Sequence, residues 1–220
     1  MFSKPLHLPG NGTEQRLLEA AGEIFAEYGY RAATVRQICE KAKANVAAVN
    51  YHFGDKDGLY VAVLRHLNKL HAAKNPTTSG LTSKATAEEK LRAFVSAMFH
   101  RMFDEDSPDW HMKLMVREMV EPTHALDAMV EESIRPLQQE LEAIVRQLLG
   151  AGADDEVVRL SALSVASQCV FYQHCRSIIS RLFPRQQYDS QEIDKLVEHV
   201  TRFSLAAFKN APEERQGKLP

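Results

Sequence analysis

The side chains of this chain that could do chemistry include nine histidines, three cysteines and 29 aspartates and glutamates. Hydrolases, zinc proteases, nucleotide-binding enzymes and dehydrogenases carry such groups, or glycines, at fixed spacings such as GxSxG, HExxH, GxxxxGKS/T and GxGxxG. None of these patterns occurs in the sequence. Cys169 and Cys175 would lie about 120° apart around a helix, which disfavours a shared metal ion. We therefore expect no catalytic residue, no metal ligand and no cofactor.

A second set of side chains, between residues 34 and 56, has the chemistry of nucleic-acid contacts. Tyr51, His52 and Lys56 can donate hydrogen bonds to phosphate oxygens. The small side chains of Ala47 and Ala48 allow a helix to approach base edges, and their methyl groups fit against thymine methyls. The competing interpretation makes residues 51–53 part of a core and Lys56 a solvated charge. The full set of expected DNA contacts is Thr34, Lys43, Asn45, Ala47, Ala48, Asn50, Tyr51, His52 and Lys56.

Short helices are expected to position this set. Apolar residues at helical spacing over 17–28 predict a first helix, which Thr13 can cap and a left-handed Gly29 can end. The sequence Thr34-Val-Arg-Gln37 is a capping box and predicts the start of a second helix. A third helix is expected over about 45–53 and ends before Gly54.

A turn of about three residues joins the second and third expected helices, and this is the helix-turn-helix arrangement. Two helices so short need the first helix as a third support, and the third one would read a major groove. Val46, Val49 and Phe53 are expected to face inward. A fourth helix should begin at Asp55 or Lys56, with these residues inward: Leu59, Tyr60, Val63, Leu67 and Leu70.

At this point the sequence resembles a known family. Phe25-Ala-Glu-Tyr-Gly-Tyr30, Thr34-Val-Arg-Gln-Ile38 and Val49-Asn-Tyr-His-Phe53-Gly-Asp-Lys56-Asp-Gly-Leu-Tyr60 resemble the TetR family of repressors in order and spacing. The resemblance implies that the expected contact set meets operator DNA. Lys43 departs from the family, which usually has glycine there, and a left-handed lysine costs about 1 kcal/mol.

The rest of the chain also has helical periodicity and no strand pattern, so we expect an all-α fold. Further helices are expected over about 86–103, 109–120, 123–149, 155–182 and 190–208. The expected domains are a flexible arm (1–12), a helix-turn-helix DNA-binding domain (13–72), a linker (73–84), a larger helical effector-binding and dimerisation domain (85–212) and a flexible tail (213–220).

The C-terminal domain resembles a TetR subfamily called CerR- or CecR-like. Four segments carry this resemblance: Arg117-Glu-Met-Val-Glu-Pro-Thr123, Ala125-Leu-Asp127, Arg135-Pro136 and Gln168-Cys-Val-Phe-Tyr172. Members include regulators placed near efflux or transport genes. Aromatic, methionine and a few polar residues suit a pocket for an apolar or aromatic effector, although at helical spacing they also suit a plain core. The expected ligand contacts are Phe99, Trp110, His111, Met115, Arg117, Gln168, Phe171 and Tyr172.

Charge and apolar surface indicate how the chain acts. Residues 1–70 hold nine Lys and Arg against seven Asp and Glu, a net charge of +2, while the remainder carries −4. Apolar residues on the last two expected helices exceed what one domain needs, which predicts a homodimer. No run of eighteen apolar residues spans a membrane, and the start lacks an apolar signal core. We expect a cytoplasmic repressor that binds a near-palindromic operator and is released by a small molecule; the alternatives are a metal-sensing regulator or a helical enzyme without a recognisable motif.

Overall fold

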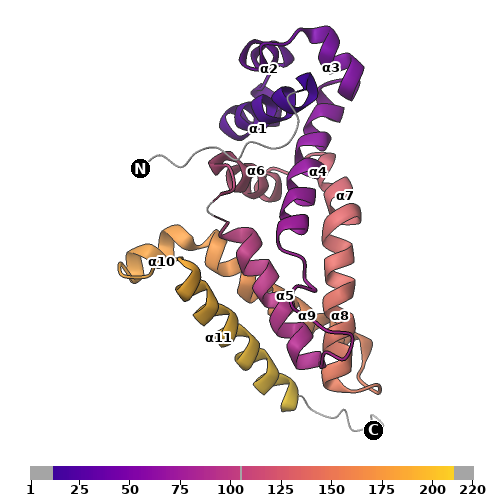
Figure 1. Cartoon of the computed structure of the whole chain (residues 1–220), viewed down its shortest axis with the longest axis vertical. Helices are drawn as coiled ribbons and strands as arrows, with labels where there is room; N and C mark the ends of the chain where they lie inside the picture. Colours follow the sequence, from indigo (N-terminus) through magenta and orange to yellow (C-terminus); the bar gives the residue numbers. More distant parts are fainter. Residues whose placement is uncertain (1–11, 105, 211–220) are drawn as a thin grey trace, which may run out of the picture. The chain divides into compact units, whose positions relative to one another are not determined.

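The computed structural model describes residues 12–104 and 106–210, and its regular secondary structure there is helical throughout (Figure 1), which confirms the predicted all-α fold. The expected arm and tail fall largely outside these residues. The elements are α1 (Thr13–Ala32), α2 (Val35–Ala42), α3 (Val46–Phe53), α4 (Lys56–Lys74), α5 (Ala87–Met102), α6 (Asp109–Val120), α7 (Ala125–Met129), the π-helical segment η1 (Val130–Ile134), α8 (Arg135–Leu149), α9 (Asp155–His174), α10 (Arg176–Leu182) and α11 (Ser190–Lys209).

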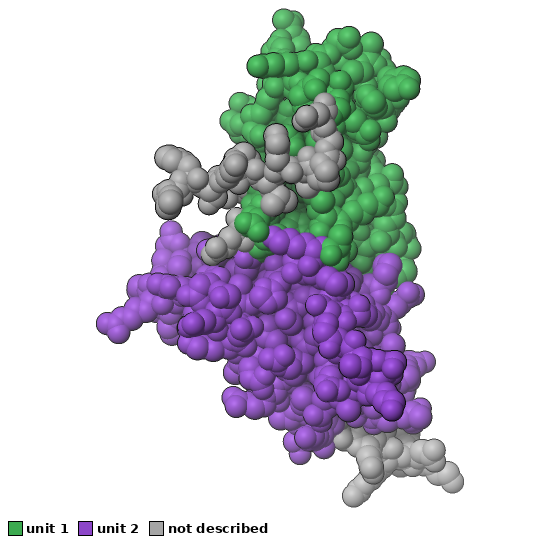
Figure 2. Space-filling view, viewed as in Figure 1, with its two compact units in different colours: residues 1–73, 104–135 green, residues 74–103, 136–220 purple. Residues whose placement is uncertain are grey.

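The chain forms two compact units (Figure 2). Unit 1 comprises residues up to 73 together with 104–135, so it joins α6, α7 and η1 to the first four helices. Unit 2 comprises residues 74–103 and the chain from 136 onward. This grouping differs from the predicted boundary at residue 85, because a buried core unites residues far apart in the sequence.

Capping explains where the helix-turn-helix pair begins and turns. The amide of Thr34 donates to Oε1 of Gln37 at 2.9 Å, while Thr34 Oγ1 accepts from the amide of Gln37 at 3.3 Å, so the capping box forms. The amide of Ala48 donates to Asn45 Oδ1 at 2.8 Å, which makes Asn45 the cap of α3. Lys43, with φ 51° and ψ 47°, supplies the left-handed residue that the sharp turn between α2 and α3 requires.

Several local expectations are wrong. Thr13 is the first residue of α1 rather than its cap, and its hydroxyl accepts from Arg16 Nη2 at 3.2 Å. Gly29 has φ 79° and ψ 163°, but it makes a kink after which the helix continues to Ala32. Val46 was expected to face inward, yet it is 49% exposed.

Two of the longer predicted helices are interrupted. The segment expected over 123–149 divides into α7, η1 and α8, although the backbone angles at Met129, Val130 and Arg135 remain helical. The helix expected to run to Leu182 ends at His174, because Cys175 leaves helical geometry (φ −96°, ψ 13°) before α10 begins.

The core of unit 1 brings α6 against α1. Leu17, Phe25 and Leu59 are fully buried together with Leu114 of α6. Gly22 of α1 is buried beneath the ring of Trp110, and a Cβ built on Gly22 would lie 2.2 Å from carbons of that ring. The absence of a side chain at this glycine is therefore what permits the close approach of the two helices.

The core of unit 2 is formed by one face of α5 packed on α9 and α11. Phe99 and Val95 are fully buried on α5, and Val197 and Val200 are buried on α11. The apolar residues in the middle of α5 and α11 therefore pack together in the core of unit 2.

The packing of α6 on α1 makes a prediction at Gly22. Gly22→Ala should lower the free energy of unfolding by about 1–3 kcal/mol, because the new methyl group forces the indole of Trp110 to move. This loss should outweigh the improved helix propensity of alanine, about 1 kcal/mol. Urea denaturation measures the difference. Gly152→Ala is the matched control, since a Cβ there meets nothing within 4 Å, and an equal loss in both variants would contradict the packing.

Candidate functional site

The third helix gives most of its surface to solvent. Of the eight residues of α3, Val49 alone is buried, while Ala48 and Phe53 pack partly against the core of unit 1. Tyr51 is 85% exposed. Four residues of the expected contact set are exposed on this helix: Ala47, Asn50, Tyr51 and His52. Ala48 was placed on the outward side, but its half-buried methyl group is less available than that of Ala47.

The start of α3 and of α2 is fixed by side chains of the expected contact set. Asn45 and Thr34 are exposed, but their side-chain oxygens accept from amides of the helices that they cap. The hydroxyl of Thr34 donates to Gln37 Oε1 at 2.8 Å, so it would have to leave that bond to donate to a phosphate, whereas the amide NH₂ of Asn45 can donate without losing the cap. Thr34 lies at the positive end of the α2 dipole, and Asn45 lies at the positive end of the α3 dipole.

Lys56 begins α4 beside the end of α1. Its ammonium lies 4.6 Å from the centre of the Tyr30 ring and donates to the carbonyl of Arg31 at 3.4 Å. Lys43 is exposed in the turn, and His52 Nδ1 lies 3.9 Å from Glu14 Oε2. Lys43 and Lys56 therefore flank α3 in the sequence, in the turn before it and at the start of the next helix.

The residues expected to bind a ligand divide between the two units. Trp110, His111, Met115 and Arg117 lie on α6 in unit 1. Phe99, Gln168, Phe171 and Tyr172 lie on α5 and α9 in unit 2. Within unit 2, the rings of Phe99 and Tyr172 lie 5.8 Å apart, whereas Phe171 is 55% exposed.

Arg117 makes contacts that its sequence neighbours did not indicate. Its Nη1 donates to the carbonyls of Ala26 and Glu27, both at 3.4 Å. A Cβ on Gly29 would lie 2.9 Å from the guanidinium carbon, so the missing side chain at Gly29 makes room for Arg117. Arg117 thus fastens α6 to carbonyls of α1.

A buried histidine pair lies at the start of α6. The rings of His71 and His111 stack with centres 4.2 Å apart, and Ser107 Oγ bonds to His71 Nε2 at 3.1 Å and to His111 Nδ1 at 3.2 Å. Burial lowers the pKa of His111 to about 3, helped by His71 and opposed by Asp104. The His111 ring is therefore neutral at physiological pH. Sequence reasoning proposed His111 but missed its partners, which come from α4 and the segment before α6.

The three cysteines lie apart from any cluster of metal-ligating side chains in the described part of the chain. Cys39 and Cys169 are buried and Cys175 is half-buried, all three as free thiols. Burial raises the pKa of Cys169 to about 12, which keeps it protonated. Residues 12–104 and 106–210 contain no group of three His, Cys, Asp or Glu side chains able to hold a metal ion. Within the same ranges, none of the helices has the length and apolar character that crossing a bilayer requires.

Two sequence profiles match the chain. The profile described as bacterial regulatory proteins, tetR family, matches residues 17–63, and the profile described as the C-terminal domain of the HTH-type transcriptional dual regulator CecR matches residues 87–208. The chain belongs to the TetR family. Its C-terminal domain is of the CecR type, so both predicted resemblances are confirmed. Members of this family are transcriptional regulators and not enzymes.

Relatives and solved structures agree with this assignment. The chain is 26% identical to the transcriptional repressor NicS of Pseudomonas putida over 81% of this chain and 84% of NicS. It is 24% identical to the dual regulator CecR of Shigella flexneri over 91% of this chain and 93% of CecR. The crystal structure of FadR from Bacillus subtilis in complex with stearoyl-CoA shares the fold, with a TM-score of 0.61 and 17% identity over 87% of this chain and 97% of FadR.

The exposure of Tyr51 in this TetR-family regulator makes a prediction. Tyr51→Ala should weaken binding to a DNA site by about 5- to 150-fold, because a side chain with 85% exposure serves the surface rather than the core. The free energy of unfolding should stay within about 0.5 kcal/mol of the wild type. Fluorescence anisotropy and urea denaturation measure the two quantities. Tyr28→Ala on α1 is the control, and equal DNA affinity in Tyr51→Ala and wild type would contradict the role.

The lowered pKa of His111 predicts a pH dependence of stability. In the unfolded chain His111 gains a proton below about pH 6.5, whereas in the folded chain it does so only near pH 3. The stability that the neutral His111 ring contributes is therefore fully present above about pH 6.5. As the pH falls toward 3, the free energy of unfolding decreases by up to about 1.4 kcal/mol per pH unit. Denaturation between pH 4 and 8 should show a shallower slope for His111→Leu, and an unchanged slope would refute a neutral His111.

Proposed function

We propose that this TetR-family regulator binds a near-palindromic operator as a homodimer and is released by a small-molecule effector. The observation that carries the proposal is α3, which buries only Val49 of its eight residues and holds Tyr51 almost fully exposed. A helix of a folded domain that gives up so much packing is suited to enter a major groove. Its start is fixed by the Asn45 cap and its end by Gly54.

The expected contacts divide by chemistry between the backbone and the bases. The phosphate set is Thr34, Lys43, Tyr51, His52 and Lys56, since these residues offer hydroxyl, ring N–H or ammonium donors. Asn45, Ala47 and Ala48 lie at or near the start of α3 and Asn50 lies at its middle, and their small side chains and amides suit base edges. Cations at Lys43 and Lys56 would make the affinity depend on salt.

A second copy of the chain is the proposed partner of unit 2. Large apolar side chains remain exposed on α9, α10 and α11 and in the segment after α10: Leu160, Leu163, Phe171, Ile178, Leu182, Phe183 and Phe203. Burying each Å² of apolar surface in an interface is worth about 25 cal/mol before the cost of association. A two-fold dimer built on this surface would present two copies of α3 to two half-sites.

The effector is proposed to be apolar or aromatic and to bind in the C-terminal domain. FadR, which shares this fold, binds stearoyl-CoA in its crystal structure. In this chain the expected contacts within unit 2 are three aromatic residues and the amide of Gln168, on α5 and α9, while the expected contacts on α6 belong to unit 1 and form a separate set. Such a set suits a largely apolar molecule with few polar groups. Control of efflux or transport genes and action in the cytoplasm complete the proposal.

The experiment that tests this function starts from DNA selected by the full chain from a random-sequence library. The selected duplexes should contain inverted half-sites about 10 base pairs, or a multiple, apart. A thermal-shift screen over long-chain acyl-CoA molecules and aromatic antibiotics should then identify compounds that stabilise the protein and lower its affinity for the selected duplex. Selection of no common sequence would overturn DNA reading, and compounds that bind without changing DNA affinity would overturn release.

The homodimer is tested by a charge placed on its proposed surface. Wild-type protein should sediment at about twice 24.8 kDa at micromolar concentration. Phe203→Glu, at a position 59% exposed on α11, should shift the protein toward the monomer and weaken operator binding by about tenfold or more. Ile134→Glu is the control, because Ile134 is also apolar and is 40% exposed but lies on η1 in unit 1. A wild-type monomer would overturn the dimer.

A further inference from the structure

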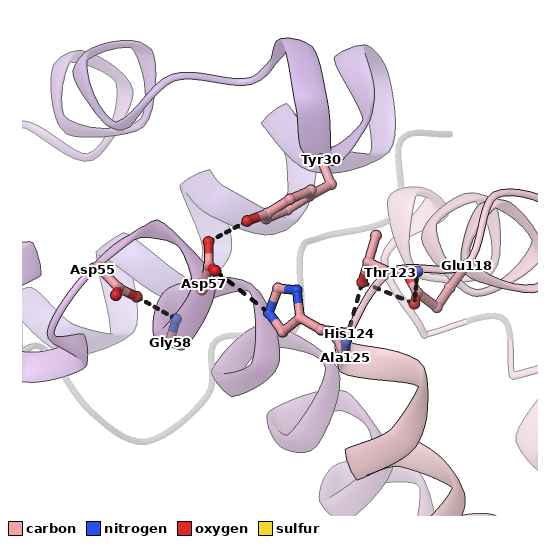
Figure 3. Close-up of polar contacts among 8 residues, drawn as sticks. All are labelled: Tyr30, Asp55, Asp57, Gly58, Glu118, Thr123, His124 and Ala125. Carbon is pink, nitrogen blue, oxygen red and sulfur yellow. Dashed lines mark hydrogen bonds and ion pairs between the residues drawn. The ribbon is translucent and has the colours of Figure 1, made fainter.

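A fully buried carboxylate joins α6 to α4 within unit 1. Glu118 has no exposed surface, and its Oε2 accepts from the hydroxyl of Tyr60 at 2.6 Å. Its Oε1 accepts from the amide of Thr123 at 2.8 Å and from the hydroxyl of Thr123 at 2.9 Å (Figure 3). A buried carboxylate is costly unless such donors satisfy it, so Tyr60 and Thr123 are held where the charge requires them.

A second contact joins the segment between α6 and α7, which contains Thr123, to the start of α4. We call residues 121–124 the α6–α7 turn. Asp57 of α4 accepts from the hydroxyl of Tyr30, and its Oδ2 lies 3.9 Å from Nε2 of His124 in the α6–α7 turn (Figure 3). The rings of His124 and Tyr30 lie 5.6 Å apart. This contact is exposed and therefore weak, so the buried contact at Glu118 dominates.

Tyr60 links the buried contact at Glu118 to Lys56, one of the proposed DNA contacts. Tyr60 is four residues after Lys56, so the two side chains lie on one face of α4. The ring of Tyr60 packs edge-on against Phe25 of α1 at 4.8 Å and lies 5.0 Å from Tyr30, the ring beneath the ammonium of Lys56. A displacement of Tyr60 therefore reaches Lys56 through α4 and through Tyr30.

We infer that Glu118 is a positioning residue for operator binding, acting through Tyr60 on α4 and Thr123 in the α6–α7 turn. The inference rests on the proposed function and adds a residue outside the helix-turn-helix to it. The carboxylate holds α4 and the α6–α7 turn in one arrangement, and that arrangement fits DNA. Because linkage between two sites is reciprocal, operator DNA must in turn stabilise the α6–α7 turn.

Hydrogen exchange of the backbone amides tests this linkage directly. The full chain is compared with and without an operator duplex selected as above, and the ratio of exchange rates is measured for residues 45–53 and for residues 119–126. In the wild type, DNA should slow exchange in both segments, by about tenfold in the second. In Tyr60→Phe, which removes one hydroxyl and keeps the ring, the ratio for residues 119–126 should fall to near one while residues 45–53 stay protected.

Two more variants separate positioning from plain stability. Glu118→Gln should keep most of the effect, because the amide can accept from Thr123 and donate to the hydroxyl of Tyr60. Tyr28→Phe, which removes a tyrosine hydroxyl outside the network, should match the wild type. Operator affinity should fall about fivefold in Tyr60→Phe and stay unchanged in Tyr28→Phe. If Tyr60→Phe does not fold, Thr123→Val removes a donor from the other side of Glu118 and should give the same loss.

The outcomes are distinguishable. If DNA protects residues 45–53 but leaves exchange of residues 119–126 unchanged in the wild type, the inference is overturned and the proposed function stands. If Tyr60→Phe raises exchange equally with and without DNA, so that the ratio is kept, Glu118 is only a stabilising residue and the inference is overturned. Absence of any sequence-selective binding by the wild type would instead overturn the proposed function.

Discussion

Helix α3, which we propose to face DNA, contributes one buried residue to its own domain, and the rest of unit 1 holds it in place. Val49 anchors α3 in a core supplied by α1, α2 and α4, while the Asn45 cap and the left-handed Lys43 fix where the helix starts. A recognition helix free to tilt would lose affinity through conformational entropy. The buried and capping residues around α3 therefore fix the position of its exposed face.

Three contacts hold α6 against α1 and α4 within unit 1. Trp110 packs on the bare backbone of Gly22, Arg117 donates to carbonyls of α1, and Glu118 is buried against Tyr60. Each of these contacts is intolerant of small displacements, because a ring, a guanidinium or a buried charge loses its partner within about an ångström. Such contacts suit a connection that must hold one of two discrete arrangements rather than bend continuously.

The same helix, α6, bears four of the residues expected to contact an effector, including the neutral His111. Because α6 packs on α1, it would give the proposed effector a direct physical route to the DNA-binding helices. An effector needs a difference in affinity of only about 1–3 kcal/mol between two positions of such a helix to regulate binding. The far end of α4, where Leu67 is buried in the same core, offers a second route.

Local rules in the sequence determined the helix-turn-helix almost completely. The capping box at Thr34, the turn before Asn45 and the stop at Gly54 depend on residues within four positions of one another, and helical periodicity alone gave the all-α fold. Tertiary structure alone decided that residues 104–135 belong to unit 1 and that Val46 faces solvent. It also decided that Glu118 accepts a hydrogen bond from Tyr60, 58 positions away. Those outcomes depend on which distant side chains share a core, and neither periodicity nor capping specifies the partner of a buried group.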